Sequence, residues 1–438
     1  MLLRDGLVIG AKNHLFVGGC DTVELAREYG TPLYVVDEMY LRGMCRAFVG
    51  AMKQCAPDGK VYYASKAFCC VAMCKIAMQE GMGLDVVSGG ELYTALKAGF
   101  PMNRVAYHGN CKTPGELRMA IELGVGRIVV DSHSEIPLIQ AIAGELESRV
   151  KVQVRMNPGI VADTHKALQT ATTDCKFGLG IDDGEALRAV KMIAGCANLS
   201  LTGVHVHLGS QIHGLAPYMR AVERLTDFMT LASIVTGAEL TELVLGGGFG
   251  VRYTQEDPPT MDPYETVLAI AQETERQAAR KGLRAPRLVL EPGRIIVAEA
   301  GVMLYTVSSV KPIEDVRTYV GVDGGMADNP RVALYGGKYE AMLANRAGEK
   351  ATGTYAIAGR ACETGDVLGY DFRLPPPEVG DILAMPVAGA YQYSMASNYN
   401  RVPVPAVVLT HYGKSEPIVA RQRYEDITQY DRTPHWLG

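Results

Sequence analysis

The chain has 438 residues, of which 48% are hydrophobic and 21% charged, the composition of an ordinary globular protein. Its net charge of -5 argues against nucleic acid as a standing partner. No stretch reaches the roughly 20 apolar residues that a membrane-spanning helix needs. Residues 1–19 are a poor signal peptide, because their apolar part contains a charge and glycines. We therefore expect a globular, cytoplasmic protein with no membrane and no nucleic-acid partner.

The ten cysteines do not form a disulfide pattern. Cys69, Cys70 and Cys74 crowd one short segment, and no CxxC pair occurs. A chain of this length also needs no cross-links to hold its core together. We expect reduced thiols, most of them packing residues, which agrees with a cytoplasmic location.

Strand and helix patterns alternate along the first two thirds of the chain. The N-terminal patterns LFVGGCDTVE and TPLYVVD read as strands, and eight further strands follow. The first four of these begin about 22 residues apart, which leaves room for one helix each. Helical candidates, each ending near a glycine, span residues 67–81, 89–99 and 113–124. The eight predicted strands are 61–65, 83–88, 104–109, 127–132, 151–157, 201–209, 242–248 and 287–293.

The alternation predicts an α/β protein with a closed barrel. Eight strands and their helices over about 230 residues are typical of a (β/α)8 barrel of the TIM type. An open, doubly wound sheet is the competing architecture. Because eight strands are the number that closes such a barrel, we favour closure and assign residues 37–293 to it.

Two stretches depart from the alternation. Residues 158–182 are too polar and glycine-rich for a plain helix and predict an excursion above the barrel. After residue 293 the helical rhythm stops, and strand patterns separated by turn residues follow. We expect residues 294–438 to form a β-sandwich or small β-barrel domain that the strands in residues 1–36 join.

Polar residues and glycines collect at the predicted C-terminal ends of the barrel strands, where barrel enzymes carry their active sites. The run Gly246 to Gly250 and the pair Gly293 and Arg294 follow the last two strands, whose loops often bind phosphate in barrels. Glycine lets backbone N–H groups approach an anion closely. Taken alone, the glycine run also fits a tight turn.

Lys66 follows an apolar strand and precedes an apolar helix. An exposed surface lysine is the simpler interpretation of this residue alone. With a phosphate site across the barrel, a lysine that forms an imine with a phosphorylated aldehyde explains both features. Glu291 would then keep a pyridine nitrogen protonated, so that the ring accepts electrons. His207 could stack on the ring, although its spacing alone fits a core histidine equally well.

Six motifs occur in order along the chain. They are ASKA at 64–67, HVHLGSQ at 205–211, GGGFG at 246–250, EPGR at 291–294, CETGD at 362–366 and GAYQYSMASNYN at 389–400. Together they resemble the fold-type III pyridoxal-phosphate decarboxylases, and among these the diaminopimelate decarboxylases, from about residue 30 to about residue 410. The resemblance implies pyridoxal 5'-phosphate as cofactor. It also implies decarboxylation of meso-diaminopimelate to L-lysine, the last step of lysine biosynthesis.

The resemblance also implies a role for each matching residue. Lys66 is similar to the lysine that carries the cofactor, and Cys362 to the acid that returns a proton to the substrate carbon. The other cofactor-binding positions match Asp85, His207, Ser210, Gly248, Glu291, Gly293, Arg294 and Tyr391. The substrate-binding positions match Arg294, Arg331, Tyr335, Glu363 and Tyr391. The family forms homodimers with shared active sites, in which the Cys362–Glu363 loop reaches the partner's site.

The chemistry of the distal substrate group supports the same choice. Diaminopimelate has a second carboxylate, which suits a bidentate arginine such as Arg331, and a second ammonium, which suits Glu363. Ornithine and lysine lack that carboxylate and would leave Arg331 unpaired, which is costly when the charge is buried. A solvated loop arginine is the simpler alternative for this residue.

Other functions stay open from sequence alone. A decarboxylase of ornithine, arginine or carboxynorspermidine is the nearest rival, and Arg331 with Tyr335 argues against it. An amino-acid racemase would leave the CETGD loop unexplained, and a non-catalytic homologue would have no use for Lys66 and Cys362. Two departures from the family pattern, Ala171 and Val404, affect loop geometry rather than the reaction.

Overall fold

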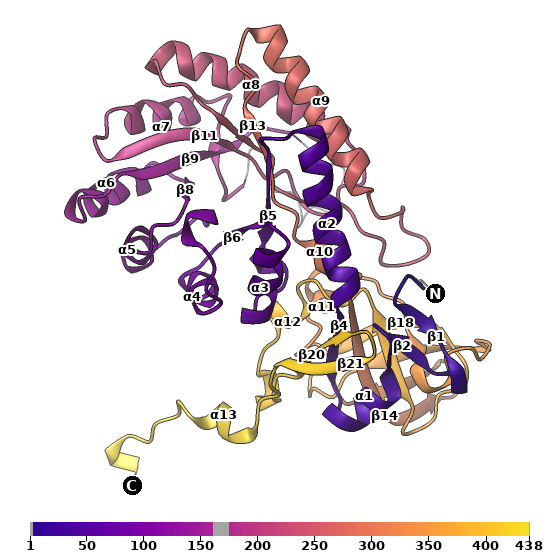
Figure 1. The fold of residues 1–438 in the computed structure, drawn as a ribbon. Helices are drawn as coiled ribbons and strands as arrows, with labels where there is room; N and C mark the ends of the chain where they lie inside the picture. The colour runs from indigo at the N-terminus through magenta and orange to yellow at the C-terminus, as the bar shows by residue number, and fades with distance from the viewer. Residues whose placement is uncertain (1–2, 161–174, 438) are drawn as a thin grey trace. The chain divides into compact units, whose positions relative to one another are not determined.

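The computed structural model describes residues 3–160 and 175–437 and divides the chain into two compact units (Figure 1). The barrel unit contains Arg42–Val251 and Pro259–Ile296. The β unit contains Met1–Leu41, Arg252–Pro258 and Val297–Gly438. The short segment 252–258, which lies inside the predicted barrel range, therefore groups with the β unit.

The barrel unit is built on eight parallel strands that close on themselves. Pairing runs in order along the strands, and the ring closes where β8 pairs with β9 and β13 pairs with β5. The predicted barrel is confirmed, and the open sheet is wrong. A two-residue strand, β10 (Leu179–Gly180), adds to β9. The barrel strands are β5 (Lys60–Ala64), β6 (Gly83–Val86), β7 (Val105–Tyr107), β8 (Arg127–Val130), β9 (Val150–Asn157), β11 (Leu199–His205), β12 (Glu242–Val244) and β13 (Arg287–Leu290).

Helices on the outside of the barrel connect its strands, one further helix precedes the first strand, and a short one follows the last (Figure 1). Their ends follow local sequence signals. Thr113 and Glu116 form a capping box before α5, and Gly237 and Gly282 end α8 and α9 in the left-handed conformation that glycine adopts easily. The helices are α2 (Glu38–Cys55), α3 (Val71–Gln79), α4 (Gly89–Lys97), α5 (Pro114–Glu122), α6 (Glu135–Glu145), α7 (Glu185–Ala194), α8 (Ala216–Thr236), α9 (Pro263–Lys281) and α10 (Arg294–Val297).

The β unit is a mixed sheet with a smaller sheet beside it. The N-terminal strand β4 (Leu33–Asp37) lies between β14 (Gly301–Ile313) and β20 (Ala406–His411), so the N-terminal strands join the C-terminal domain as predicted. The remaining strands of the large sheet are β15 (Arg317–Val322), β16 (Met342–Leu343), β17 (Gly353–Ala358), β18 (Val367–Leu374), β19 (Ile382–Pro386) and β21 (Lys414–Val419). The small sheet contains β1 (Leu7–Ile9), β2 (Leu15–Val17) and β3 (Cys20–Asp21).

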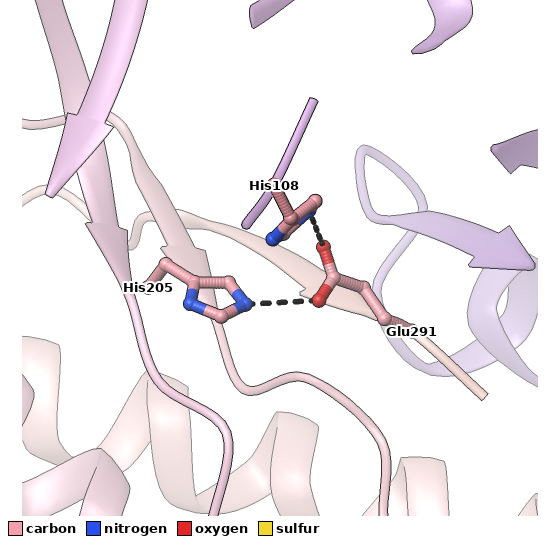
Figure 2. A group of neighbouring side chains, drawn as sticks. All are labelled: His108, His205 and Glu291. Carbon is pink, nitrogen blue, oxygen red and sulfur yellow. Dashed lines mark hydrogen bonds and ion pairs between the residues drawn. The ribbon is translucent and has the colours of Figure 1, made fainter. Parts of the chain in front are cut away.

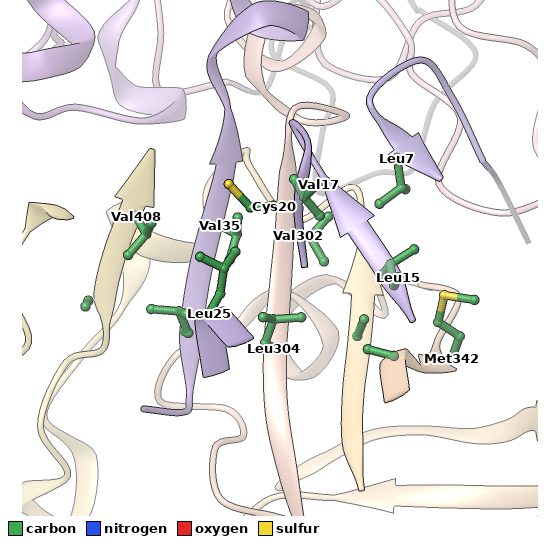
Figure 3. Close-up of a cluster of buried hydrophobic side chains, with 14 residues drawn as sticks. Leu7, Leu15, Val17, Cys20, Leu25, Val35, Val302, Leu304, Met342 and Val408 are labelled. Atoms are coloured by element: carbon green, nitrogen blue, oxygen red, sulfur yellow. The ribbon is translucent and has the colours of Figure 1, made fainter. Parts of the chain in front are cut away.

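One apolar core holds both sheets of the β unit together (Figure 3). Val35 of β4 and Leu304 of β14 are fully buried, as are Val17 of β2 and Val408 of β20. Helix α1 (Thr22–Tyr29), capped by Asp21, adds Leu25 to the same cluster. Residues more than 370 positions apart in sequence thus remove each other's surface from water, which is why the N-terminal strands cannot form a domain of their own.

The described residues bear only in part on the expectations about membrane-spanning helices and about the segment 158–182. Within the described residues, none of the helices combines the length and the apolar character needed to cross a bilayer. The predicted excursion 158–182 falls mostly outside the described residues, as does Ala171.

Candidate active site

Several polar side chains meet at the C-terminal end of the barrel. Lys66 follows β5 in a short 3-10 turn (Ser65–Ala67), and Asp85 lies in β6. His108 follows β7, His205 ends β11, and Glu291 follows β13. Because parallel strands end on the same face of a barrel, residues far apart in sequence converge here.

Glu291 is the centre of a buried cluster (Figure 2). One carboxylate oxygen lies 2.9 Å from Nε2 of His205, and the other lies 3.1 Å from Nε2 of His108. Nε2 of His108 is also 3.6 Å from a carboxylate oxygen of Asp85. All four side chains are almost completely buried. The ligand atoms of the Glu291 cluster lie within 4.8 Å of one another, close enough for a metal, but ion pairing between the imidazoles and the carboxylate accounts for the arrangement.

The charges in this cluster follow from the contacts. Burial acts to raise the pKa of Glu291, but the two imidazoles outweigh it and hold that pKa well below its usual value. Burial acts to lower the pKa of His108, but the carboxylates of Asp85 and Glu291 raise it overall. Burial lowers the pKa of His205 to about 4. The favoured state is an anionic Glu291 between a protonated His108 and a neutral His205.

The cluster also contains buried polar atoms that fit a further ligand. Among the described side chains, Ser65 Oγ, Asp85 Oδ1 and His205 Nδ1 are buried and have no hydrogen-bond partner. Burial raises the pKa of Asp85, so its charge is only partly compensated. Buried polar groups are normally satisfied, and exceptions concentrate where a cofactor or substrate binds. These atoms therefore mark the same barrel end as Lys66.

A glycine cradle lies beside this cluster. Gly248 has φ of +92°, and a Cβ there would lie 2.3 Å from the carbonyl oxygen of Gly209. A Cβ on Gly247 would lie 2.3 Å from the carbonyl oxygen of Glu291, and one on Gly293 would lie 2.9 Å from the Ala64 side chain. A side chain at any of these positions would clash with its neighbours, so only glycine lets the three backbone segments pack this closely; glycine also leaves nearby N–H groups uncovered for an anion. The cradle fits a phosphate group.

Two side chains complete the cradle. The guanidinium of buried Arg294 donates to Oγ of Ser210 at 2.8 and 3.2 Å. His207 accepts the N–H of Gly247 at Nδ1 at 3.4 Å. Burial holds the pKa of His207 well below its usual value, with the charges of Lys66 and Arg155 acting in the same direction. A neutral, partly buried imidazole suits packing against an aromatic ring.

A second cluster forms within the β unit around Arg331, the first residue of α11 (Arg331–Tyr335). Its Nη1 donates to the hydroxyl of Tyr339 at 2.6 Å and to that of Tyr253 at 3.0 Å. The ring of Tyr391 lies 6.0 Å from the guanidinium carbon. Arg331 is buried, so the interpretation of it as a solvated loop arginine is wrong. Its neutral phenol partners leave its charge available for an anion.

Cys362 and Glu363 lie on an exposed loop between β17 and β18. The N–H of Cys362 donates to Oδ1 of Asn400 at 2.8 Å, and the hydroxyl of Tyr399 donates to Glu363 at 3.3 Å. The loop is therefore held in place by the GAYQYSMASNYN segment while both side chains face outwards.

The structure thus brings the predicted residues together in separate groups. The barrel unit gathers Lys66, Asp85, His207, Ser210, Gly248, Glu291, Gly293 and Arg294. The β unit contains Arg331, Tyr335, Cys362, Glu363 and Tyr391. Sequence reasoning did not assign roles to His108, His205, Tyr253 and Tyr339. A signal existed for the two histidines, which end predicted barrel strands, but none existed for the two tyrosines.

The known proteins that this chain resembles are pyridoxal-dependent decarboxylases. A family model described as "Pyridoxal-dependent decarboxylase, pyridoxal binding domain" matches residues 43–298, more than half of the chain. Diaminopimelate decarboxylase of Bacillus subtilis is 46% identical over 95% of both chains. The protein of that name from Synechocystis is 39% identical and covers the whole of this chain and 94% of its own.

Solved structures agree with these relatives. Diaminopimelate decarboxylase from M. jannaschii, in a complex with L-lysine, superposes with a TM-score of 0.93 at 35% identity and covers 100% of both chains. The Helicobacter pylori enzyme with L-lysine gives a TM-score of 0.85 at 30% identity and covers 93% of this chain and 98% of its own. A lysine/ornithine decarboxylase from Vibrio vulnificus, at 22% identity, shares the fold.

Proposed function

The chain belongs to the diaminopimelate decarboxylase family, and we propose that it decarboxylates meso-diaminopimelate to L-lysine with pyridoxal phosphate held on Lys66. The observation that carries this proposal is the anionic Glu291, buried between His108 and His205 at the barrel end where Lys66 emerges. When bound, pyridoxal phosphate supplies an electron sink for the charge left when carbon dioxide departs.

The barrel residues would hold this cofactor at both ends. Glu291 would keep a proton at the pyridine nitrogen, because a carboxylate with a lowered pKa stabilises a neighbouring cation. Gly248 and Gly293 would offer backbone N–H groups to the phosphate, with Ser210 and Arg294 beside them. Neutral His207 would pack against the ring, and Asp85 would fix His108.

The β-unit residues would select the substrate. Buried Arg331 suits the distal carboxylate of diaminopimelate, which ornithine and lysine lack. Tyr335, Tyr391 and Arg294 would add hydrogen bonds, and Glu363 would bind the distal ammonium. A substrate without the distal carboxylate would leave Arg331 buried without a counter-charge, which disfavours ornithine and lysine.

Cys362 would deliver the proton that replaces carbon dioxide. Its exposed loop agrees with a homodimer in which each Cys362–Glu363 loop completes the partner's site. The free state of all ten cysteines favours a reducing compartment, and we place the protein in the cytoplasm.

A carbon dioxide release assay tests the reaction. It compares meso-diaminopimelate, lysine, ornithine and arginine, each with and without pyridoxal phosphate. We expect release from diaminopimelate alone, and only with the cofactor. Borohydride treatment of the loaded protein should leave a stable adduct on Lys66, located by mass spectrometry. Efficient release from ornithine, or no adduct on Lys66, would contradict the proposal.

Cys362→Ala tests the proton donor. We expect a decrease in turnover of about 10² to 10⁴-fold, because the substrate carbon loses its general acid, while the borohydride adduct on Lys66 still forms. Cys196→Ala, which removes a thiol after α7, is the matched control and should keep normal turnover. A normal rate for Cys362→Ala would remove this thiol from the acid role.

A further inference from the structure

The C-terminal arm, residues 423–437, has the composition of an interface but is exposed in the single chain. After β21 the described residues up to 437 form two short helical turns, α13 (Tyr424–Thr428) and a 3-10 turn (His435–Leu437), and neither buries a residue. Tyr430 is 80% exposed, Trp436 is 73% exposed and Leu437 is 69% exposed. Figure 1 shows this segment running away from strands β20 and β21 of its own unit. Tryptophan and tyrosine, together with arginine, are enriched among the residues that contribute most to protein interfaces.

The arm starts from a fixed point. Just before it, the guanidinium of Arg421 donates to the carbonyl oxygens of Gly30 at 3.0 Å and Pro32 at 2.6 Å. The side-chain oxygen of Gln422 accepts from Asn398 at 2.6 Å and from the N–H of Val404 at 2.9 Å. These contacts set the direction in which the arm leaves the β unit. The apolar residues beyond are therefore presented at a defined place.

The arm is tied to the Cys362–Glu363 loop through three consecutive residues. Tyr399 and Asn400 hold the loop, through the contacts to Glu363 and Cys362 described above. The next residue, Arg401, pairs with Asp431 of the arm at 2.6 Å. The loop that would enter a partner's site and the exposed arm thus share one support on the surface of the β unit.

We propose that the C-terminal arm packs on a second copy of this chain and buries Trp436 there. This inference rests on the proposed function, in which the Cys362–Glu363 loop completes the partner's site. The contacts that join the arm to the Cys362–Glu363 loop favour a second copy of the chain over an unrelated protein as the binding partner. Contacts made by Tyr430, Trp436 and Leu437 would hold the partner close, and the Arg401–Asp431 pair would keep the loop and the arm in register.

The chain contains one tryptophan, so its fluorescence reports on the arm directly. Full-length protein loaded with pyridoxal phosphate is diluted across the range in which sedimentation velocity follows the monomer–dimer equilibrium. We expect the fluorescence emission of Trp436 to shift to shorter wavelength as the dimer forms. The midpoint concentration of this shift should equal that of the dimerisation measured by sedimentation. Emission that stays unchanged through dimer formation overturns the proposal, as does blue-shifted emission in the monomer, which would mean that the arm packs on its own chain.

Substitutions in the arm give the second measurement. Trp436→Ala should weaken the dimer about tenfold or more, since a buried aromatic at an interface centre contributes strongly. Trp436→Phe should retain most of the affinity. Tyr264→Ala, which removes an exposed tyrosine from α9, is the matched control. An unchanged dissociation constant for Trp436→Ala overturns the arm proposal alone.

Activity on dilution separates this proposal from the proposed function. Trp436→Ala should lose carbon dioxide release at concentrations where the wild type retains it, and regain it at high concentration. A wild-type chain that stays monomeric and fully active overturns the shared site, and the arm proposal with it. A dimer that forms equally well without Trp436 leaves the shared site intact and removes only the arm.

Discussion

Glu242 and Glu291 are buried at opposite ends of the barrel and have different partners. Glu242, the first residue of β12, lies at the N-terminal end, where Arg287 approaches to 3.2 Å and Arg127 to 3.4 Å. The side-chain amide of Gln153 donates to it at 2.7 Å. Glu291, at the opposite end, has two histidines instead of two arginines. Both carboxylates are 5% exposed, so burial does not distinguish them.

The partners distinguish them. Arginine is always charged, so the charge on Glu242 is compensated at any ordinary pH and its role is structural. Histidine titrates near neutrality, so the surroundings of Glu291 respond to charge and ligand. Among the described residues, buried atoms without a hydrogen-bond partner occur at both ends: Ser65 Oγ and His205 Nδ1 near Glu291, and Arg127 Nε beside Glu242. The difference is therefore in the partners: a carboxylate between permanently charged arginines serves the fold, whereas one between titratable histidines can respond to a bound ligand.

Glu291→Gln should have the largest effect. Without the anion, turnover should decrease by about 10² to 10⁴-fold, because the pyridine nitrogen would lose the group that keeps it protonated. Carbon dioxide release gives the rate, and the absorption spectrum reports whether the cofactor still binds. Glu242→Gln, the same substitution at the other end, should keep its rate within about threefold. Similar losses of activity in both variants would refute the distinction.

Glu242→Gln should instead lower the stability of the fold. Arg127, which is mostly buried, would lose its carboxylate, and the free energy of unfolding should decrease by roughly 2–3 kcal/mol. Urea unfolding measures this change. A stability equal to that of the wild type would show that Gln153 and water satisfy Arg127 without the glutamate.

His108→Asn should destabilise the protein by about 2 kcal/mol near pH 6, because a charged imidazolium between two carboxylates is lost. The pKa of His108 is raised in the folded protein above its ordinary value of 6.5. Its contribution is therefore complete below pH 6.5 and disappears as the pH rises through the raised value. Urea unfolding between pH 6 and 9 should show the gap to wild type closing. A gap that widens with pH would mean that His108 is neutral in the fold.

Arg287→Ala should have the smallest effect. Its side chain is 46% exposed, so solvent screens its pair with Glu242, and the loss should stay below about 1 kcal/mol. Thermal unfolding is sensitive enough for this comparison. A much larger loss would mean that Arg287, rather than Arg127, compensates Glu242.

The sequence was most informative where one residue type serves one purpose. Glycines 247, 248 and 293 were identified from the sequence because only glycine allows such close backbone approach. Lys66 and Glu291 were identified from their place after apolar strands. The sequence did not assign roles to His108 and His205, since a histidine at a strand end reads equally as a core residue. It missed Tyr253 because the segment 252–258, placed in the barrel from sequence, groups with the β unit.

The sequence by itself determined the alternation of strands and helices, the number of barrel strands and the residue types at their ends, because hydrophobic period and glycine placement are local properties. Tertiary structure alone decided which carboxylate faces histidine and which faces arginine, and that Arg331 is buried among tyrosines. These outcomes depend on contacts between residues tens to hundreds of positions apart. Closure of the barrel and burial, rather than local pattern, fix such contacts and the charges they stabilise.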